Sequence, residues 1–175
     1  MIYLKQKIKG LMLIKPEPFL DKRGLLRRIY CYKEFNLKKI KFSIKQANIS
    51  ENKNIQTLRG FHYQKFPYGE DKIISCIQGE IHNIVIDMRK NSKTFMKWQS
   101  FLLSEKNRFG LLVPKGCANA YLTLKKKTWV LYFHSQIYKP GFEKSIKYND
   151  PKFKFDWPKK IKVLSQKDNS IKLIK

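Results

Sequence analysis

Residues 72–87, KIISCIQGEIHNIVID, contain two runs of β-branched and other apolar residues that are joined across Gly79 and Glu80. Two such runs around a glycine are the usual signal of a β-hairpin. Runs of the same kind follow at 98–103, 109–113, 120–124 and 128–135, and turn residues separate them. Short strands that recur about every 8–12 residues are typical of sandwiches and barrels, so the sequence predicts an all-β domain.

The residues before position 72 continue this pattern. Residues 10–35 predict two strands around a turn at 21–24, and the second strand is expected to reach Tyr32. A short helix is predicted over residues 33–40. A strand beginning at 42–44 then leads to Gln46 and Asn48, and another strand, carrying Arg59 and His62, lies between loops at 51–54 and 66–71.

The C-terminal part of the chain differs in character because prolines interrupt it. Phe153, Phe155 and Trp157 alternate with charged residues, which predicts an edge strand laid on the barrel. Residues 164–175 predict a short terminal turn or helix. Since no linker or internal repeat appears, residues 1–175 are expected to form a single domain.

The chain is strongly basic, with 38 lysines and arginines against 13 acidic residues and a formal net charge of +25. The lysines are scattered along the whole length, and no RNP, zinc-finger or helix-turn-helix pattern appears. This charge favours the attraction of small anions. No apolar run approaches the roughly 20 residues of a membrane span, and the N-terminus lacks a secretory cleavage signal. We therefore expect a cytoplasmic protein that binds neither nucleic acid nor membrane.

Arg59 and His62 lie three positions apart at the end of a predicted strand, and both residue types are scarce here. Only six of the 38 basic residues are arginines, and the chain has three histidines. Arginine binds phosphate or carboxylate through a planar fork that lysine lacks, and histidine is the usual general base near neutral pH. The pair therefore indicates a binding and catalytic site. The spacing alone is also compatible with a structural histidine beside a solvated arginine.

Residues 110–119, GLLVPKGCAN, have the G-x3-P-x-G-x2 spacing of the second conserved turn of cupin jelly rolls. Metal-binding cupins have histidine where this chain has Asn119, and they use an HxH pair where His62 is followed by Tyr63 and Gln64. One histidine without a neighbouring ligand holds a divalent metal poorly. Cysteines are odd in number and lack a CxxC pair, so we expect free buried thiols and no metal site.

A longer set of motifs follows in one order from about residue 15 to residue 168. It comprises Phe19-x-Asp21-x-Arg23-Gly24, Gln46-x-Asn48-x-Ser50, Leu58-Arg-Gly-Phe-His-Tyr-Gln64, Lys72, Asp87-x-Arg89, Pro114-x-Gly116, Tyr132, Tyr138-x-Pro140, Trp157-Pro158 and Lys167-Asp168. In this the sequence resembles the dTDP-4-dehydrorhamnose 3,5-epimerases and their relatives that act on other nucleotide-linked 4-keto sugars. The resemblance implies a cupin jelly-roll barrel with short peripheral helices.

The resemblance also implies a cofactor-independent mechanism, since a C4 ketone acidifies the protons on C3 and C5 of the sugar. His62 is expected to be the base, and Asp168 to orient its ring. Lys72 is expected to stabilise the enolate oxygen, and Tyr132 to deliver a proton from the opposite face. Taken singly, the last three would be read as a surface lysine, a core tyrosine and a solvated carboxylate.

Further expectations from the resemblance concern substrate binding and assembly. Arg59 and Arg23 are expected to hold the diphosphate, with Arg23 coming from the same chain or from the partner subunit. Gln46, Asn48 and Tyr138 are expected to contact the substrate. The family forms homodimers that share N-terminal strands, so a homodimer is expected here. His82 and His134 match no functional position and are expected to be structural or exposed.

Two positions depart from the family pattern. Arg28 stands where the dTDP enzymes have a glutamate that contacts thymine, and a guanidinium has no acceptor for the thymine N3 proton. Arginine commonly donates to guanine, which suggests a GDP-linked 4-keto hexose or heptose for a surface polysaccharide. Asn119 stands where the family has histidine near the sugar, which suggests a changed sugar or epimerisation at one carbon only. The alternatives are a sugar-nucleotide 3,4-ketoisomerase and a non-catalytic cupin that binds sugar nucleotides.

Overall fold

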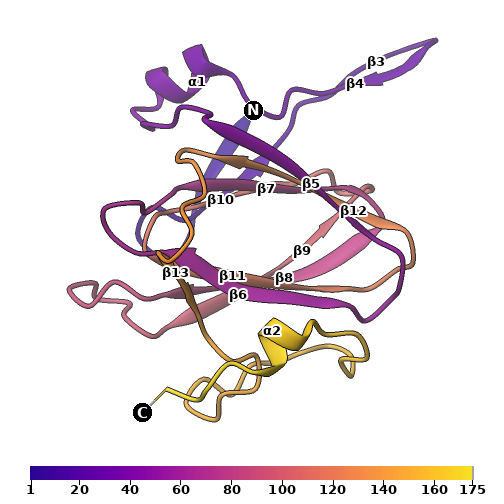
Figure 1. The fold of residues 1–175 in the computed structure, drawn as a ribbon. Coiled ribbons are helices and arrows are strands. Elements are labelled where there is room, and N and C mark those ends of the chain that lie inside the picture. Colours follow the sequence, from indigo (N-terminus) through magenta and orange to yellow (C-terminus); the bar gives the residue numbers. More distant parts are fainter. Residues whose placement is uncertain (175) are drawn as a thin grey trace.

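Two antiparallel sheets face each other in a computed structural model that describes residues 1–174 (Figure 1). The six-stranded sheet has the order β1 (Ile2–Lys5), β2 (Met12–Lys15), β10 (Gly110–Val113), β7 (Lys72–Gln78), β12 (Thr128–His134) and β5 (Gln46–Asn52). The five-stranded sheet has the order β13 (Glu143–Ser145), β6 (Leu58–Gln64), β11 (Cys117–Thr123), β8 (Glu80–Asp87) and β9 (Trp98–Ser104). The peripheral elements are a ribbon of β3 (Phe19–Asp21) and β4 (Gly24–Leu26) and the helices α1 (Tyr32–Leu37) and α2 (Gln166–Asn169).

The central strands are apolar on both faces because both faces are covered. On β8, Ile81 and Val85 point into the core between the sheets, whereas Ile84 and Ile86 pack under the C-terminal segment on the outer face. All seven residues of β11 are buried for the same reason. The continuous apolar runs of the sequence thus reflect two-sided burial, and the predicted all-β architecture is confirmed.

The predicted hairpin across Gly79 is wrong, although both of its strands form. β7 pairs with β10 and β12, while β8 pairs with β9 and β11, so the chain passes from one sheet to the other at Gly79. Gly79 has φ +78°, and a Cβ there would lie 2.4 Å from Thr128 Oγ1. A corner between sheets and a hairpin both require this left-handed glycine, so the local sequence does not distinguish them.

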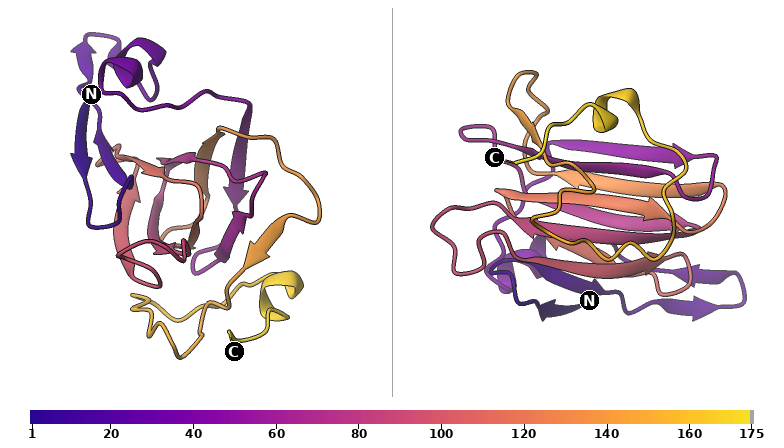
Figure 2. Two further views of the ribbon diagram at one scale, coloured as in Figure 1. Left: turned by 90° about the vertical axis from the view of Figure 1, so that its left-hand side faces the viewer. Right: turned by 90° about the horizontal axis from the view of Figure 1, so that it is seen from below.

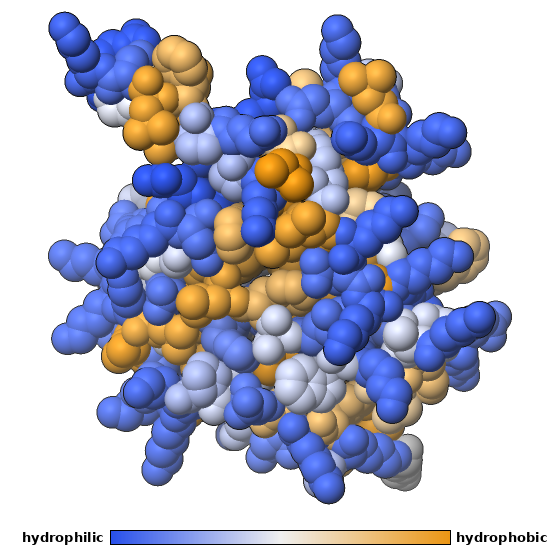
Figure 3. Space-filling model, turned by 180° about the vertical axis from the view of Figure 1, so that it is seen from behind, coloured by the Kyte–Doolittle hydropathy of each residue, from blue (hydrophilic) through white to orange (hydrophobic). Residues whose placement is uncertain are grey.

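The N-terminal region contains less strand than predicted. The strand expected to reach Tyr32 ends with β4 at Leu26, and α1 begins at Tyr32, one residue before the helix predicted over 33–40. The β3–β4 ribbon projects from the barrel (Figure 1) and stands at the upper left of Figure 3, where apolar side chains are visible on it. Phe19, Leu20 and Leu26 are exposed there, with Leu26 at 74%.

The C-terminal segment runs beneath the five-stranded sheet (Figure 2). The predicted edge strand at 153–157 does not form, and β13 takes the place beside β6. The rings of Phe153, Phe155 and Trp157 instead pack on the outer-face core, where Phe155 lies 4.6 Å from Phe61 between ring centroids. The alternating aromatic residues at 153–157 therefore belong to a segment that packs on the sheet and not to a strand within it. The predicted terminal helix is confirmed as α2, and no described helix has the length and apolarity to cross a membrane.

Candidate active site

A cavity of about 590 Å³ opens between the two sheets. Side chains from both sheets and from the α2 region line it, namely Asn48, Ile49, Ser50, Thr57, Leu58, Arg59, His62, Lys72, Asn119, Tyr132, His134, Val163, Leu164, Ser165, Lys167 and Asp168. An adjoining chamber of about 360 Å³ shares four of these residues, Asn48, His62, Lys72 and His134, and adds Gln46 and Tyr138. Both volumes suit a small-molecule ligand, for which about 300–1,000 Å³ is usual.

Gly60 explains why Arg59 and His62 share the cavity. Residues three apart on a regular strand point to opposite faces, but the β6–β11 register shifts between the partners of Arg59 and His62. Gly60 has φ +116°, and a Cβ there would lie 2.6 Å from Ala120 Cα. Only glycine fits this irregularity, which turns both side chains toward one space. Arg59 is held in place by a 2.9 Å hydrogen bond from its Nε to Asn52 Oδ1.

His62 lies between two carboxylates. Its Nε2 is 2.8 Å from Asp168 Oδ1, and its Nδ1 is 3.2 Å from Glu143 Oε1 and 3.0 Å from Ser145 Oγ. Asp168 sits in α2, where its backbone N–H donates to the Ser165 side chain at the start of the helix. Burial alone raises the pKa of Asp168, but the contact with His62 and other hydrogen bonds bring it below its ordinary value. Asp168 is therefore ionised and lies in close contact with the His62 ring.

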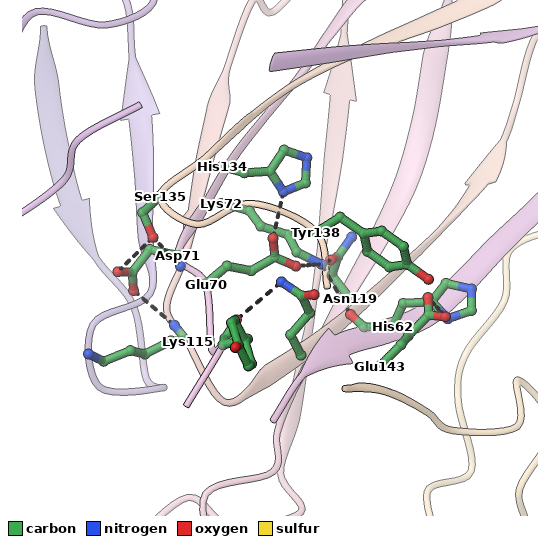
Figure 4. A network of polar contacts seen from close by, with 12 residues as sticks. His62, Glu70, Asp71, Lys72, Lys115, Asn119, His134, Ser135, Tyr138 and Glu143 are labelled. Atoms are coloured by element: carbon green, nitrogen blue, oxygen red, sulfur yellow. Dashed lines mark hydrogen bonds and ion pairs between the residues drawn. The ribbon is translucent and has the colours of Figure 1, made fainter. Parts of the chain in front are cut away.

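Lys72 is buried at the start of β7 and contacts three acceptors (Figure 4). Its Nζ lies 3.2 Å from Glu70 Oε1 and donates to Asn119 Oδ1 and to the His62 backbone oxygen, both at 3.3 Å. An ammonium has three hydrogens, so these contacts use all of its donors. Asn119 and the His62 backbone belong to the sheet opposite Lys72, and their contacts hold the ammonium group beside His62.

Tyr132 lies on β12 and lines the same cavity as His62, which comes from the opposite sheet. Desolvation raises the pKa of Tyr132 well above its ordinary value, and the neighbouring Tyr121 adds to this effect. The phenol is therefore protonated at neutral pH and can act as a proton donor. An imidazole and a phenol thus enter one cavity from opposite sheets.

The structure brings together most of the residues predicted for the site. His62, Lys72, Tyr132, Asp168, Asn48, Arg59 and Asn119 line the main cavity, and Gln46 and Tyr138 line the adjoining chamber. Arg23 and Arg28 lie elsewhere in the described chain. Arg23 is 88% exposed at the β3–β4 turn and pairs with Asp21, while Arg28 Nη1 donates to Glu34 Oε1 at 2.6 Å.

Sequence reasoning missed several polar residues of the cavity. His134 was expected to be structural or exposed, yet it lines both chambers and its Nδ1 lies 2.9 Å from Glu70 Oε2. Glu143 and Ser145, which contact His62, were also missed. A signal for His134 was present, since it follows Tyr132 by two positions on one strand and must share its face. His82 lies outside the cavity against Trp157.

The comparisons with known proteins agree with this geometry. The sequence profile of the family described as dTDP-4-dehydrorhamnose 3,5-epimerase matches residues 5–175. The chain belongs to this family. The dTDP-4-dehydrorhamnose 3,5-epimerase of Sinorhizobium fredii is 33% identical over 171 residues, which cover 97% of this chain and 88% of that protein.

Two solved structures of dTDP-sugar epimerases have the same fold. The dTDP-4-dehydrorhamnose 3,5-epimerase of Bacillus anthracis, solved with TDP and PPi bound, has a TM-score of 0.95 and 32% identity over 99% of each chain. The dTDP-6-deoxy-D-glucose-3,5-epimerase of Legionella pneumophila, in complex with dTDP-4-keto-L-rhamnose, has a TM-score of 0.92 and 32% identity, and the match covers 98% of this chain and 92% of that one. The predicted family and the cupin jelly roll are confirmed.

Proposed function

We propose that this protein is a cofactor-independent isomerase that inverts C3, C5 or both in a nucleoside-diphosphate 4-keto sugar. The observation that carries the proposal is the placement of His62 and Tyr132, which enter one cavity from opposite sheets with Lys72 beside them. Epimerisation needs a base on one face of the carbon, an acid on the other, and stabilisation of the enolate between them. The family membership of the chain supports the same reaction.

In the proposed mechanism, Asp168 sets the tautomer of His62. Of the two carboxylates beside the ring, Asp168 is the nearer, at 2.8 Å from Nε2 against 3.2 Å from Nδ1 to Glu143, and the Ser145 hydroxyl at 3.0 Å can donate to Nδ1. The ring proton in this mechanism is therefore on Nε2 and the lone pair on Nδ1. Nδ1 takes the C–H proton, and Glu143 Oε1 at 3.2 Å then stabilises the new positive charge together with Asp168. No net redox change occurs, and the step balances without a cofactor.

Lys72 stabilises the enolate that forms when the proton leaves. Its ammonium donates to the C4 oxygen as negative charge accumulates there, which is the role of an oxyanion donor. Because its three donors already have acceptors, the substrate oxygen must replace one of them. The neutral oxygen of Asn119 or of the His62 backbone is easier to replace than the Glu70 carboxylate, since bonds to charged groups are stronger.

Tyr132 completes the inversion by protonating the carbon from the other face. The test is solvent-deuterium uptake at C3 and C5 in a panel of 4-keto sugar nucleotides, read by NMR. Uptake at both carbons indicates a 3,5-epimerase, and uptake at C3 alone indicates that Asn119 accompanies a narrower reaction. A wild-type protein that takes up no deuterium with any member of the panel refutes the proposal in favour of a non-catalytic binding protein. A 3,4-ketoisomerase would instead yield a 3-keto product.

For the nucleotide, we propose a dTDP-linked substrate, because the similar proteins named above act on dTDP-sugars or bind TDP or a dTDP-sugar. The prediction that Arg28 binds guanine stays open to test. Within the single chain its guanidinium is engaged by Glu34, so a guanine would have to compete with that ion pair. Isothermal titration with dTDP and GDP decides between them, and tighter GDP binding that is lost in Arg28→Ala supports guanine recognition.

We also propose a homodimer in which the β3–β4 ribbon reaches the partner subunit. The ribbon exposes Phe19, Leu20 and Leu26 away from its own barrel, and this apolar surface is suited to burial in an interface. A partner's site would then receive Arg23 at the ribbon tip, which the chain's own cavity lacks. Sedimentation velocity tests the dimer. A mixture of Arg23→Ala and His62→Asn chains that regains activity shows that Arg23 acts across the interface.

A cytoplasmic role in surface polysaccharide synthesis is proposed with this function.

A further inference from the structure

His134 contacts three of the proposed site residues or their partners. It lies on β12 directly opposite Lys72 on β7, and it follows Tyr132 by two positions, so all three side chains share one face of the six-stranded sheet. Its ring stacks on Tyr132 with a centroid distance of 5.8 Å and an interplanar angle of 20°. Its Nε2 lies 3.3 Å from Asn48 Nδ2. The proposed reaction gives this residue no role.

The link from His134 to Lys72 passes through Glu70. Glu70 Oε2 lies 2.9 Å from His134 Nδ1, and Glu70 Oε1 lies 3.2 Å from Lys72 Nζ (Figure 4). Burial raises the pKa of Glu70, but the hydrogen bond from His134 and the charge of Lys72 bring it below its ordinary value. Glu70 is thus a carboxylate that only accepts, so His134 Nδ1 donates to it, and the Asn48 amide donates to Nε2.

We propose that His134 is a positioning residue for the epimerisation, holding Lys72 through Glu70 and the Tyr132 phenol through ring stacking. This inference rests on the proposed function and extends it. Lys72 must exchange one acceptor for the substrate oxygen, and the Glu70 carboxylate is the contact best able to keep the ammonium in place during that exchange. Without a donor at position 134, the carboxylate loses the partner that fixes its direction.

Three substitutions separate the two parts of this role. His134→Asn keeps an N–H donor near the place of Nδ1 and loses the ring, whereas His134→Phe keeps the ring and loses the donor. His134→Ala loses both. The matched control is His82→Asn, because His82 lies outside the cavity against Trp157. A misplacement of about 1 Å in a catalytic group can cost about 100-fold in rate, which sets the scale expected for the alanine variant.

The experiment measures kcat and KM for deuterium uptake, with dTDP affinity and thermal unfolding for each variant. We expect His134→Ala to lower kcat about 10- to 100-fold with KM and dTDP affinity within about threefold of wild type, and Asn and Phe to lie between. Glu70→Gln combined with His134→Ala should lose little more than the more damaging of the two single variants, since both act on Lys72 as one unit. His82→Asn should keep the wild-type kcat.

Several results overturn this role of His134. One is a kcat for all three variants within threefold of wild type. Another is a loss in kcat that follows the folded fraction or the dTDP affinity, which indicates a merely structural histidine. The role is also overturned if kcat of the double variant falls by the product of the two single-variant factors for Glu70→Gln and His134→Ala, because the two residues then act independently. If the alanine variant does not fold, His134→Asn, His134→Phe and Glu70→Gln give the same comparison. An inactive wild type refutes the proposed function instead.

Discussion

Asp168→Asn tests the ion pair on which the proposed proton abstraction depends. The carboxylate is 4% exposed and lies 2.8 Å from His62 Nε2, so the substitution changes one atom in a buried and close contact. Two consequences follow from the chemistry of the amide. The charge that stabilises the imidazolium is lost, and the amide N–H₂ can face Nε2 and demand an acceptor there, which moves the ring proton to Nδ1 and removes the base.

The magnitude follows from these two effects. A hydrogen bond to a charged group contributes about 1.5–3 kcal/mol, roughly twice a neutral bond, so loss of the charge alone slows the reaction about 10-fold. The wrong tautomer adds to this, and a comparable substitution in a serine protease triad costs about 10⁴-fold. We expect kcat for Asp168→Asn to fall by about 10²- to 10⁴-fold, with the affinity for dTDP unchanged because Asp168 acts on the proposed base His62.

The assay is the initial rate of deuterium uptake at the sugar carbons, measured by NMR with wild type, Asp168→Asn and the exposed control Asp156→Asn. Isothermal titration with dTDP and far-UV circular dichroism confirm that each variant folds and binds. A kcat for Asp168→Asn within threefold of wild type would refute the tautomer argument. An equal loss in Asp156→Asn would show that the effect is general rather than local.

Three further predictions address the acid, the bulge and a buried ion pair. Tyr132→Phe should lower the rate of inversion about 10²- to 10⁴-fold while His62 still exchanges the C–H proton with solvent. NMR should then find deuterium at a carbon that keeps its configuration. If proton exchange falls as much as inversion does, His62 and Tyr132 do not have separate roles. Gly60→Ala places a methyl group 2.6 Å from Ala120 Cα at a backbone φ of +116°. It should lower the free energy of unfolding by about 3 kcal/mol and abolish activity. A midpoint of urea unfolding equal to that of wild type contradicts this prediction. Asp87 is fully buried and accepts a hydrogen bond from Arg89. Burial raises the pKa of Asp87, but this and its other hydrogen bonds lower it far below the ordinary value. Asp87→Asn should therefore lower the free energy of unfolding by about 3 kcal/mol at pH values above about 4. Because the folded pKa is depressed, that difference should shrink as the pH falls below about 4, and a difference in urea unfolding that is constant with pH contradicts the assignment.

Local sequence was sufficient for most strands, whereas the cavity residues on them were predicted mainly from the resemblance to a family. Strands buried on both faces, such as β7 and β11, appear as apolar runs, and Lys72 lies at the start of β7. His62 and Tyr132 lie on β6 and β12, which are partly exposed. The β-hairpin at Gly79 was predicted wrongly because pairing depends on which strand arrives from elsewhere in the chain, whereas the glycine records only a left-handed turn. In this fold the left-handed Gly79 forms a corner between the two sheets.

The wrongly predicted strand at 153–157 and the missed cavity position of His134 have a different origin. Alternation at 153–157 arises from aromatic rings packed on Phe61 and its neighbours, a tertiary contact that mimics strand periodicity. The pairing of His134 with Glu70 was missed because Glu70 lies 64 positions earlier, and the spacing shows only that His134 shares a face with Tyr132. Arg23 and Arg28, predicted to bind substrate, lie outside the cavity of their own chain.

The saturated Lys72 ammonium has a consequence for inhibitor design. In the proposed binding mode, a ligand that ends at the diphosphate engages Arg59 but leaves the three acceptors of Lys72 in place, so it gains nothing from that charge. A compound with a neutral hydroxyl at C4 would exchange one ordinary hydrogen bond for another. Only an anionic oxygen at C4, resembling the enolate, would draw the ammonium from its neutral partners, so selective inhibitors of this site should be enolate mimics.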